Sequence, residues 1–260
     1  MTFSTITLAQ HGSVAVLTFN RADRRNAFNV KMMEEIVAAC EDVGRSEDAR
    51  TLVITGGPEV FSAGADLTEA LKVTTADECA RFFGSLRRLN SAVETLNKPV
   101  IAAIEGFCIT GGCEFALACD LRIAGEGATF AITSSRIGTI AGAGGTQRLP
   151  RIVGISNALS ILFSAEPIDA EEALRIGLIN KKTIRGGALA AALSVAKTYS
   201  ERAPLSLSLT KQAVRQGMDL DFDAAIDLEM SLVSKIYGTQ DKQEGISAFL
   251  EKRKPKFQGR

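Results

Sequence analysis

Short apolar segments that end at glycine alternate with amphipathic segments over most of this chain, and this alternation restricts its fold more than any other feature. The segments "RTLVITGG", "KPVIAAIEG" and "LRIAG" have the length and the β-branched content of buried strands. Residues 29–44 and 76–96 carry apolar side chains at helical spacing, and "GGCEFALACD" has the character of a short buried helix. Strands that alternate with helices predict stacked βα units in the first two-thirds of the chain.

The two ends of the chain differ from this middle part. Residues 4–9 and 13–19 flank "QHG" and predict a strand, a turn and a second strand. Helical spacing continues through residues 156–163, 169–176, 187–202 and 204–217, and no strand signal follows residue 204. We therefore expect an α/β core over residues 1–200 and a C-terminal helical region over residues 201–260.

Composition excludes several classes of protein. Thirty basic residues balance thirty acidic ones, so no excess positive charge indicates a nucleic-acid partner. No apolar run reaches the roughly 20 residues that a membrane span needs, and the first residues do not resemble a signal peptide. The five cysteines are odd in number and favour reduced core residues of a cytoplasmic protein. With one histidine and no CxxC motif, we expect no metal site.

The segment "FSAGAD" is the first candidate for chemistry. It follows a buried strand, and its small residues leave backbone N–H groups accessible, so Ala65 and its neighbours could donate hydrogen bonds to an anion or a polarised carbonyl. The competing interpretation is an ordinary strand-to-helix turn, which glycine and small residues also favour.

The segment "TGGCE" is the second candidate. Gly111 and Gly112 stand where a strand is expected to pass into a helix, where the first N–H groups lack helical partners and the helix dipole is positive. The competing interpretation is a pair of packing glycines. Two such sites, each after a buried strand, could together supply the two donors of an oxyanion hole.

Glu114 follows Gly111 by three residues, which is nearly one helical turn. Its apolar neighbours would remove water from the carboxylate and raise its pKa toward the range of a general acid or base. The alternative is a structural glutamate that forms an ion pair with Arg122 or Arg148, because an unpaired buried carboxylate is costly.

Other catalytic signatures are not supported. His11 lies in an expected turn, so a Ser-His-Asp triad is not indicated. The segment "GAGGTQ" does not match G-x-G-x-x-G, and the chain has no phosphate-binding GxxxxGK[ST] motif. The basic tail "EKRKPKFQGR" is most simply a solvated chain end, although a phosphate partner would also suit it.

Five segments in this order and spacing resemble the crotonase (enoyl-CoA hydratase/isomerase) superfamily: "NRADRRNAFN", "FSAGADL", "KPVIAAIEGFCITGGCEFALACDLRIAG", "GAGGTQRLPRIVG" and "GISAFLEKRKPKF". The resemblance extends from about residue 5 to residue 257. It implies a spiral of ββα units with a C-terminal α-helical trimerisation region, assembled as a homotrimer or a dimer of trimers. It also implies an enzyme that acts on an acyl-CoA thioester and needs no further cofactor.

The resemblance further implies roles for particular residues. The backbone N–H groups of Ala65 and Gly111 would polarise the thioester carbonyl, and Glu114 would be the first catalytic acid. Phe249 and Lys252 would contact coenzyme A, sometimes on a neighbouring subunit. The other positions that would contact coenzyme A are Arg24, Arg25, Ala63, Ala65, Asp66, Leu67 and Thr68. Residues 68–85 and 132–140 would shape the acyl pocket.

This sequence departs from the family pattern at three positions. Ser134 stands where hydratases of the family carry a second glutamate, Ala141 replaces a usual proline, and Thr110 replaces one glycine of a usual triple. Serine does not titrate near pH 7. The expected reaction is hydration of a 2-enoyl-CoA to a 3-hydroxyacyl-CoA, with Ser134 placing the water. A single-acid enoyl-CoA isomerase, a related crotonase reaction and an acyl-CoA-binding protein with little turnover remain alternatives.

Overall fold

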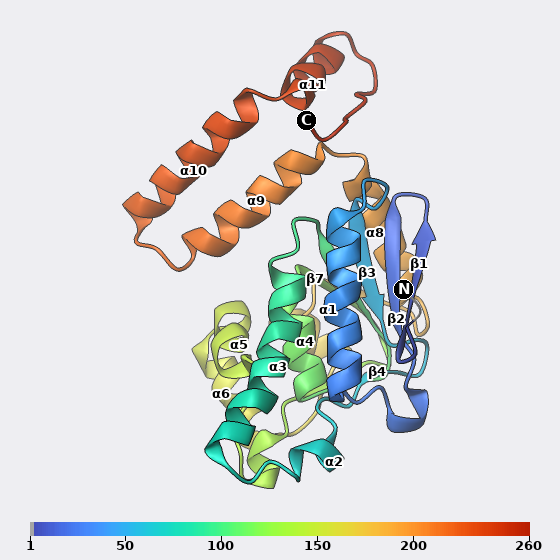
Figure 1. Cartoon of the computed structure of the whole chain (residues 1–260), viewed down its shortest axis with the longest axis vertical. Helices are drawn as coiled ribbons and strands as arrows, with labels where there is room; N and C mark the ends of the chain where they lie inside the picture. Colours follow the sequence, from blue (N-terminus) through green and yellow to red (C-terminus); the bar gives the residue numbers. More distant parts are fainter. Residues whose placement is uncertain (1–2) are drawn as a thin grey trace.

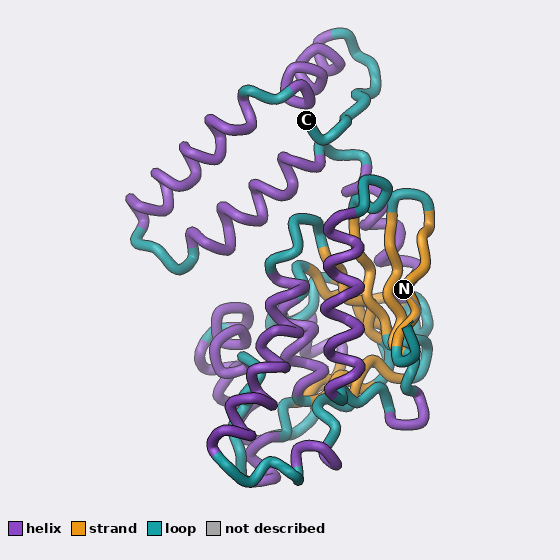
Figure 2. Tube along the Cα trace, viewed as in Figure 1, coloured by secondary structure: helices purple, strands orange, loops and turns teal. Residues whose placement is uncertain are grey.

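The computed structural model describes residues 3–260, and two sheets form its centre (Figures 1 and 2). The larger sheet has the strand order β1 (Ile6–His11), β2 (Val14–Phe19), β3 (Thr51–Thr55), β5 (Val100–Ile104), β7 (Leu121–Gly125) and β10 (Lys181–Thr183). The smaller sheet has the order β4 (Val60–Ser62), β6 (Phe107–Ile109), β8 (Thr129–Ala131) and β9 (Ile168–Asp169). All neighbouring strands pair in parallel except β1 with β2 and β8 with β9.

A ββα unit recurs along the chain. Each unit places one strand in the larger sheet, the next strand in the smaller sheet and then a helix. The units are β3 and β4 followed by α2 (Leu67–Ala70) and α3 (Ala76–Glu94), β5 and β6 followed by α4 (Gly111–Ala118), and β7 and β8 followed by a 3-10 turn (Ser134–Ile137) and α5 (Gly145–Val153). The expected α/β spiral of ββα units is therefore confirmed.

Helices cover both faces of the larger sheet, which explains the continuous apolar runs of its strands. Alternate side chains of β3 point to opposite faces: Leu52 and Ile54 join the main core with α1 (Val30–Arg45), α3 and α4, whereas Val53 packs under α8 (Ala188–Ser200). The alanines of α8 allow this helix to lie close to the sheet, because their small side chains fill little space. Both faces are therefore buried, and β3 is buried along its whole length.

Three C-terminal helices follow the core, and the first of them is joined to it by ion pairs. They are α9 (Pro204–Gly217), α10 (Phe222–Tyr237) and α11 (Gln240–Leu250), and Figure 1 shows α9 and α10 as a hairpin that projects from the core. Two further helices, α6 (Ile155–Ser164) and α7 (Ala170–Arg175), follow α5. Among residues 3–260 no helix is both long and apolar enough to cross a lipid bilayer.

The smaller sheet was missed by the sequence interpretation. The segment "FSAGAD" was expected to follow a buried strand, but its first two residues are the end of β4 itself, and α2 begins directly after it. The expected turn at His11 is also wrong, because His11 is the last residue of β1. Strands of two or three residues are too short to show a period of two in the sequence, so only their pairing reveals them.

Candidate active site

The pairing of β4 with β6 brings together two segments that are distant in the sequence. Ser62 and Cys108 are paired residues of these parallel strands. Ala65 follows Ser62 by three residues, and Gly111 follows Cys108 by three residues. Because the two strands run in the same direction, equal offsets place the two following segments side by side. The strand register therefore sets Ala65 beside Gly111.

The backbone N–H of Ala65 is turned toward Gly111. Phe28 bonds to the residues on both sides of Ala65: its N–H donates to the Gly64 carbonyl at 2.7 Å, and its carbonyl accepts from the Asp66 N–H at 2.9 Å. In extended backbone, successive N–H groups point to opposite sides, so that of Ala65 points away from Phe28. A Cβ atom on Gly111 would lie 3.0 Å from the Ala65 nitrogen.

Both N–H groups are available to a ligand. Within residues 3–260, neither the Ala65 nor the Gly111 N–H donates a hydrogen bond. Gly111 is the first residue of α4, where the helix offers its N–H no partner and the dipole is positive. Gly64 has a φ of 96°, and a Cβ atom there would lie 2.8 Å from the Gly111 nitrogen. Glycine at 64 therefore keeps the two donors close and unobstructed, which is the geometry of an oxyanion hole.

Glu114 lies one turn along α4 from Gly111 and is 2% exposed. Its Oε1 accepts hydrogen bonds from the N–H groups of Ala143 at 2.8 Å and Gly145 at 2.9 Å. No residue of the described chain donates a hydrogen bond to its Oε2. Burial raises the pKa of Glu114 to about 7, although the two N–H donors and Arg148 partly offset the effect. This carboxyl therefore changes protonation near neutral pH.

The alternative of a structural ion pair at Glu114 is not what the structure shows. Arg148 pairs instead with Glu94, at 2.6 Å between Nη2 and Oε2. Arg122 donates to the backbone carbonyls of Leu178 and Cys119. Across residues 3–260, no ion pair reaches Glu114. The pKa of Glu114 stays high because burial raises it and because the two N–H donors and the Arg148 charge lower it by less than an ion pair would.

Ser134 is buried and begins the turn that follows β8. The residue before it is tied to α4: the Oγ1 atoms of Thr133 and Thr110 lie 2.8 Å apart, and the Thr133 N–H donates to the Thr110 Oγ1 at 3.1 Å. Thr110 immediately precedes Gly111 and has a φ of 46°, which is unfavourable for a β-branched residue. Its hydrogen bonds to Thr133 hold this conformation and keep Ser134 near the start of α4.

The segment at Arg24 and Arg25 lies against the segment at Ala63. The Ala63 N–H donates to the Arg25 carbonyl at 3.0 Å. The sequence interpretation missed Asn26, whose buried side-chain amide donates to three carbonyls around β4: those of Gly56, Val60 and Phe61. An asparagine beside two arginines carries no periodic signal, so only the folded structure reveals this role.

The Asp66 carboxylate has a structural role at the start of α2. Its carboxylate accepts hydrogen bonds from the Thr68 hydroxyl at 2.7 Å and the Arg21 guanidinium at 3.1 Å, and both lower its pKa. The same carboxylate also accepts from the Thr68 backbone N–H at 3.1 Å, which caps α2, while its bond with Arg21 ties α2 to the segment before Arg24. Leu67 and Thr68 are exposed at the start of α2, where they can contact a ligand.

Phe249 and Lys252 are not brought to this site within one chain. Phe249 is 82% exposed near the end of α11, and Lys252 follows that helix. Figure 1 shows α11 at the opposite end of the molecule from α2. Any contact of these two residues with a ligand near Ala65 would thus need a second copy of the chain.

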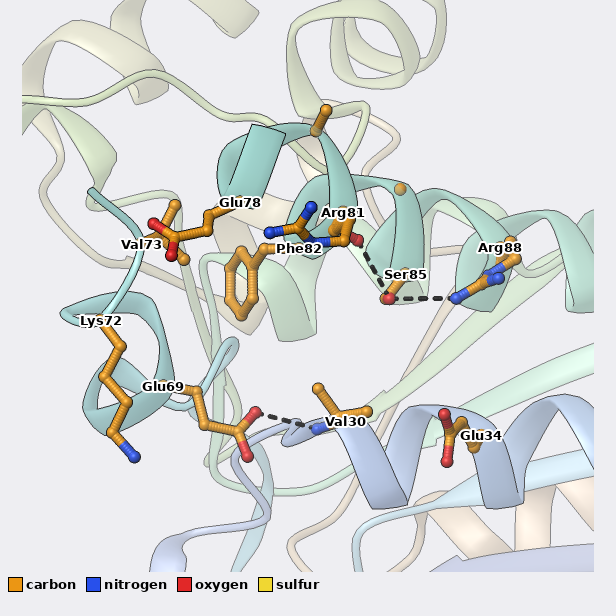
Figure 3. Close-up of a pocket in the computed structure, with 12 residues that line it drawn as sticks. Val30, Glu34, Glu69, Lys72, Val73, Glu78, Arg81, Phe82, Ser85 and Arg88 are labelled. Carbon is orange, nitrogen blue, oxygen red and sulfur yellow. Dashed lines mark hydrogen bonds between the residues drawn. The ribbon is translucent and has the colours of Figure 1, made fainter. Parts of the chain in front are cut away.

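A pocket of about 790 Å³ lies between α1, α2 and α3 (Figure 3). Its charged lining residues are Glu34, Glu69, Glu78, Lys72, Arg81 and Arg88. Three carboxylates balance three cations, so the pocket has no net attraction for a phosphate. Neither Glu114 nor Gly111 lines it, and we assign the chemistry to the site at Glu114. In residues 3–260 no group of three His, Cys, Asp or Glu side chains is placed to hold a metal ion.

Two kinds of comparison place this site in a known context. The model of the family described as enoyl-CoA hydratase/isomerase matches residues 9–260. The chain is 38% identical to a short-chain-enoyl-CoA hydratase of Clostridium acetobutylicum, covering 98% of this chain and 97% of that protein. It is 39% identical to a crotonyl-CoA hydratase of Syntrophomonas wolfei, covering 99% of both.

A solved structure agrees with these relatives. The crystal structure of an enoyl-CoA hydratase from Bacillus anthracis superposes with a TM-score of 0.95, at 31% identity, over 99% of this chain and 100% of that one. The matched length therefore extends over both the α/β core and the C-terminal helices. The chain belongs to the enoyl-CoA hydratase/isomerase family.

Proposed function

We propose that this protein hydrates a short-chain 2-enoyl-CoA to the corresponding 3-hydroxyacyl-CoA. The observation that carries the proposal is a buried carboxyl with a pKa near 7, Glu114, one helical turn from two free N–H donors. Relatives named for short-chain-enoyl-CoA and crotonyl-CoA hydration support the substrate class.

The proposed mechanism uses the two donors on the thioester. The N–H groups of Ala65 and Gly111 bind the thioester oxygen, and they bind it more strongly as negative charge develops there. Ionised Glu114 takes a proton from water while the water oxygen bonds to Cβ. The resulting enolate collapses, and Cα takes the proton from Glu114, which becomes ionised again. Only the elements of water are added, so this chemistry calls for no redox group.

Because position 134 is a serine, the proposed mechanism uses a single titrating carboxyl, that of Glu114. In the proposed reaction Glu114 both removes and returns the proton, because a serine hydroxyl does not ionise near pH 7. Ser134 is a hydrogen-bond partner for the attacking water, supported by its place beside Thr133, which is tied to the start of α4.

We also propose how coenzyme A is bound and how copies of the chain assemble. The segment Ala63–Thr68 lines the thioester channel, and the exposed arginines Arg24 and Arg25 attract the phosphates. Phe249 and Lys252 serve the site of a neighbouring copy in a homotrimer or a dimer of trimers. Exposed apolar side chains on the C-terminal helices support this assembly: Val214, Met218, Phe222, Met230 and Tyr237.

The proposed division of the chain follows from the same assembly. Residues 1–200 form the catalytic spiral, and residues 201–260 form the region that joins the copies. A cytoplasmic location is supported by the five cysteines, all of which are free.

The test is the turnover of crotonyl-CoA, followed as the loss of the conjugated thioester absorbance. The wild type should hydrate it, and Glu114→Ala should lose about 10²–10⁴-fold in kcat. Raised melting temperature with crotonyl-CoA but no turnover by the wild type would overturn the hydratase assignment and leave a thioester-binding site.

A second reaction is favoured by the same single carboxylate. One carboxyl can remove a proton from Cα of a 3-enoyl-CoA and return it to the γ carbon, which moves the double bond to position 2. Incubation with a 3-enoyl-CoA distinguishes the two: formation of conjugated 2-enoyl-CoA before any hydration supports isomerisation, and unchanged substrate excludes it.

A further inference from the structure

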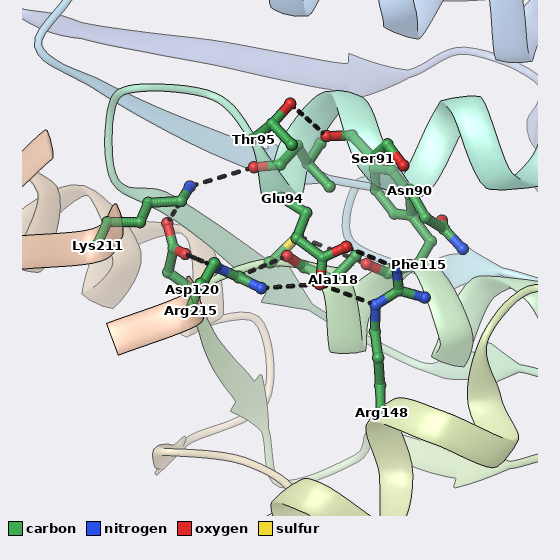
Figure 4. A network of polar contacts seen from close by, with 12 residues as sticks. Asn90, Ser91, Glu94, Thr95, Phe115, Ala118, Asp120, Arg148, Lys211 and Arg215 are labelled. Carbon is green, nitrogen blue, oxygen red and sulfur yellow. Dashed lines mark hydrogen bonds and ion pairs between the residues drawn. The ribbon is translucent and has the colours of Figure 1, made fainter. Parts of the chain in front are cut away.

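Five partly buried charged side chains connect the C-terminal helix α9 to the core: Glu94, Asp120, Arg148, Lys211 and Arg215 (Figure 4). They come from the end of α3, the residue before β7, α5 and α9. No residue of α9 (Pro204–Gly217) is buried. The hold of α9 on the core therefore depends strongly on its two long cationic side chains.

One path of this network leads to the backbone that holds Glu114. Arg148 donates two hydrogen bonds to the Glu94 carboxylate, one from Nε at 3.0 Å and one from Nη2 at 2.6 Å. Its remaining nitrogen, Nη1, donates to the Ala143 carbonyl at 3.1 Å. The Ala143 N–H in turn donates to the Glu114 carboxylate. The orientation of residue 143 is thus coupled to the Glu94–Arg148 pair.

A second residue holds the same carbonyl from α3. The Asn90 side-chain amide donates to the Ala143 carbonyl at 2.6 Å, and Asn90 is buried. Two donors from different elements therefore fix residue 143 between them. Glycine at 144 gives the Arg148 guanidinium its space, because a side chain there would collide with Nη1.

Arg215 of α9 bonds both to Glu94 and to the C-terminal end of α4. Its Nη1 donates to Glu94 Oε1 at 2.8 Å, so Glu94 is shared between Arg148 and Arg215. Its Nη2 donates to the Ala118 carbonyl at 2.9 Å, at the C-terminal end of α4. The other end of α4 carries Gly111 and Glu114. A cation at a helix C-terminus also stabilises that helix through its dipole.

The charges around Glu114 can be followed element by element. Arg148 of α5 is the cation that lowers the pKa of Glu114 against the effect of burial. Glu94 of α3 faces Arg148. Burial raises the pKa of Glu94, but Arg148 and the cations of α9, Arg215 and Lys211, together lower it by more. The Glu94 side chain is 26% exposed, so water weakens these ion pairs less than it weakens pairs on the open surface.

We propose that Arg215, acting through Glu94 and Arg148, is a positioning residue that couples the docking of α9 to the placement of the Glu114 carboxylate. The catalytic meaning of this coupling rests on the proposed function, but the coupling itself can be measured on Glu114 without turnover. Through it, the seating of the C-terminal region affects the catalytic carboxyl of the same chain.

The test follows the titration of Glu114 by NMR in the full-length protein labelled with ¹³C at the glutamate carboxyl, assigned by the resonance lost in Glu114→Gln. Arg215→Met leaves Glu94 to neutralise Arg148 more fully, so the Glu114 pKa should rise by about 0.5 unit. Glu94→Gln frees the Arg148 charge, so the pKa should fall. Shifts of the same sign in both variants would indicate general loosening and overturn the proposal.

A double variant separates action through Arg148 from a direct field. In the Arg148→Met background, Arg215→Met should shift the Glu114 pKa by less than about 0.1 unit, because the connecting residue is gone. An undiminished shift in that background would overturn the proposal. Arg175→Met is the matched control, since Arg175 pairs with exposed Glu172 on α7. It should leave the titration and the activity as in the wild type.

Activity adds a separate measurement. Arg215→Met should lower kcat on crotonyl-CoA about 3–10-fold and change KM little, while Arg215→Lys should recover part of the loss. If the wild type hydrates no enoyl-CoA, the proposed function fails, and the titrations still decide the coupling. If Arg215→Met fails to fold, the Glu114 pKa is compared in Glu94→Gln and in the double variant Glu94→Gln/Arg148→Met. An unshifted Glu114 in Glu94→Gln would overturn the proposal.

Discussion

The backbone nitrogen of Ala65 lies 3.0 Å from the position that a Cβ atom would occupy on Gly111. A methyl group there would push the two N–H donors apart, because the atom it meets is backbone. We expect Gly111→Ala to lower kcat by about 10²-fold, the cost of losing one oxyanion donor. Steady-state kinetics on crotonyl-CoA measure this loss.

The matched control for that substitution is Gly238→Ala at the end of α10, where a Cβ atom would meet only the Lys235 carbonyl, at an ordinary contact distance of 3.8 Å. It should keep full activity, because the helical backbone conformation at this position suits alanine. Full activity in Gly111→Ala would show that the two N–H groups do not act together on the substrate.

The pH dependence of kcat/KM follows from the pKa of Glu114 at about 7. The proposed reaction begins with ionised Glu114, so kcat/KM should rise with pH and be roughly tenfold lower at pH 6 than at pH 8. The residual activity of Glu114→Gln should lack this rise. A flat wild-type profile between pH 6 and pH 8 would contradict the role of Glu114 as the base.

Stability should respond to the same carboxyl with the opposite trend. Its folded-state pKa is raised from 4.5 to about 7, so its contribution to folding is complete below pH 4.5 and is lost as the pH rises through 7. Glu114→Gln cannot ionise, so it should become more stable relative to the wild type by about 3 kcal/mol between pH 4.5 and pH 8. Urea unfolding of both proteins at several pH values measures this difference, and parallel stability curves would contradict it.

Ser134 is expected to orient water without exchanging a proton. Ser134→Ala should lower kcat about 3–10-fold, which corresponds to one lost hydrogen bond, and leave the pH profile in place. Ser135→Ala is the control, because the Ser135 hydroxyl donates to the Leu162 carbonyl of α6. A change in the pH profile of Ser134→Ala would show that Ser134 takes part in proton transfer.

The apolar side chains of α10 are expected to be covered by other copies. Phe222 is 78% exposed in the single chain. Phe222→Asp should therefore shift the protein toward smaller species by light scattering after size exclusion, because it places a charge in the contact. Ser234→Asp introduces the same charge at an exposed polar position of α10 and should leave the assembly unchanged. A mass of Phe222→Asp equal to that of the wild type would exclude Phe222 from the contact.

Several parts of the site follow from the sequence. The spacing of Gly111 and Glu114, the apolar residues around them and the strand that precedes them indicate a desolvated carboxyl at a helix start. The resemblance then pairs Gly111 with Ala65. Neither source indicates that Ala143 and Gly145 hold Glu114, because these residues bind through backbone N–H groups that any residue except proline carries.

The sequence by itself determined the alternation of strands and helices, the helical C-terminal region and the identity of the chemical group at position 114, because these depend on local periodicity and residue type. Tertiary structure alone decided that Arg148 pairs with Glu94 and leaves Glu114 without an ion pair. It also decided that two three-residue strands, β4 and β6, align Ala65 with Gly111. Such choices depend on contacts between residues that are 46 and 54 positions apart in the sequence. The energies of competing partners for one charged group are settled only when the whole chain is packed.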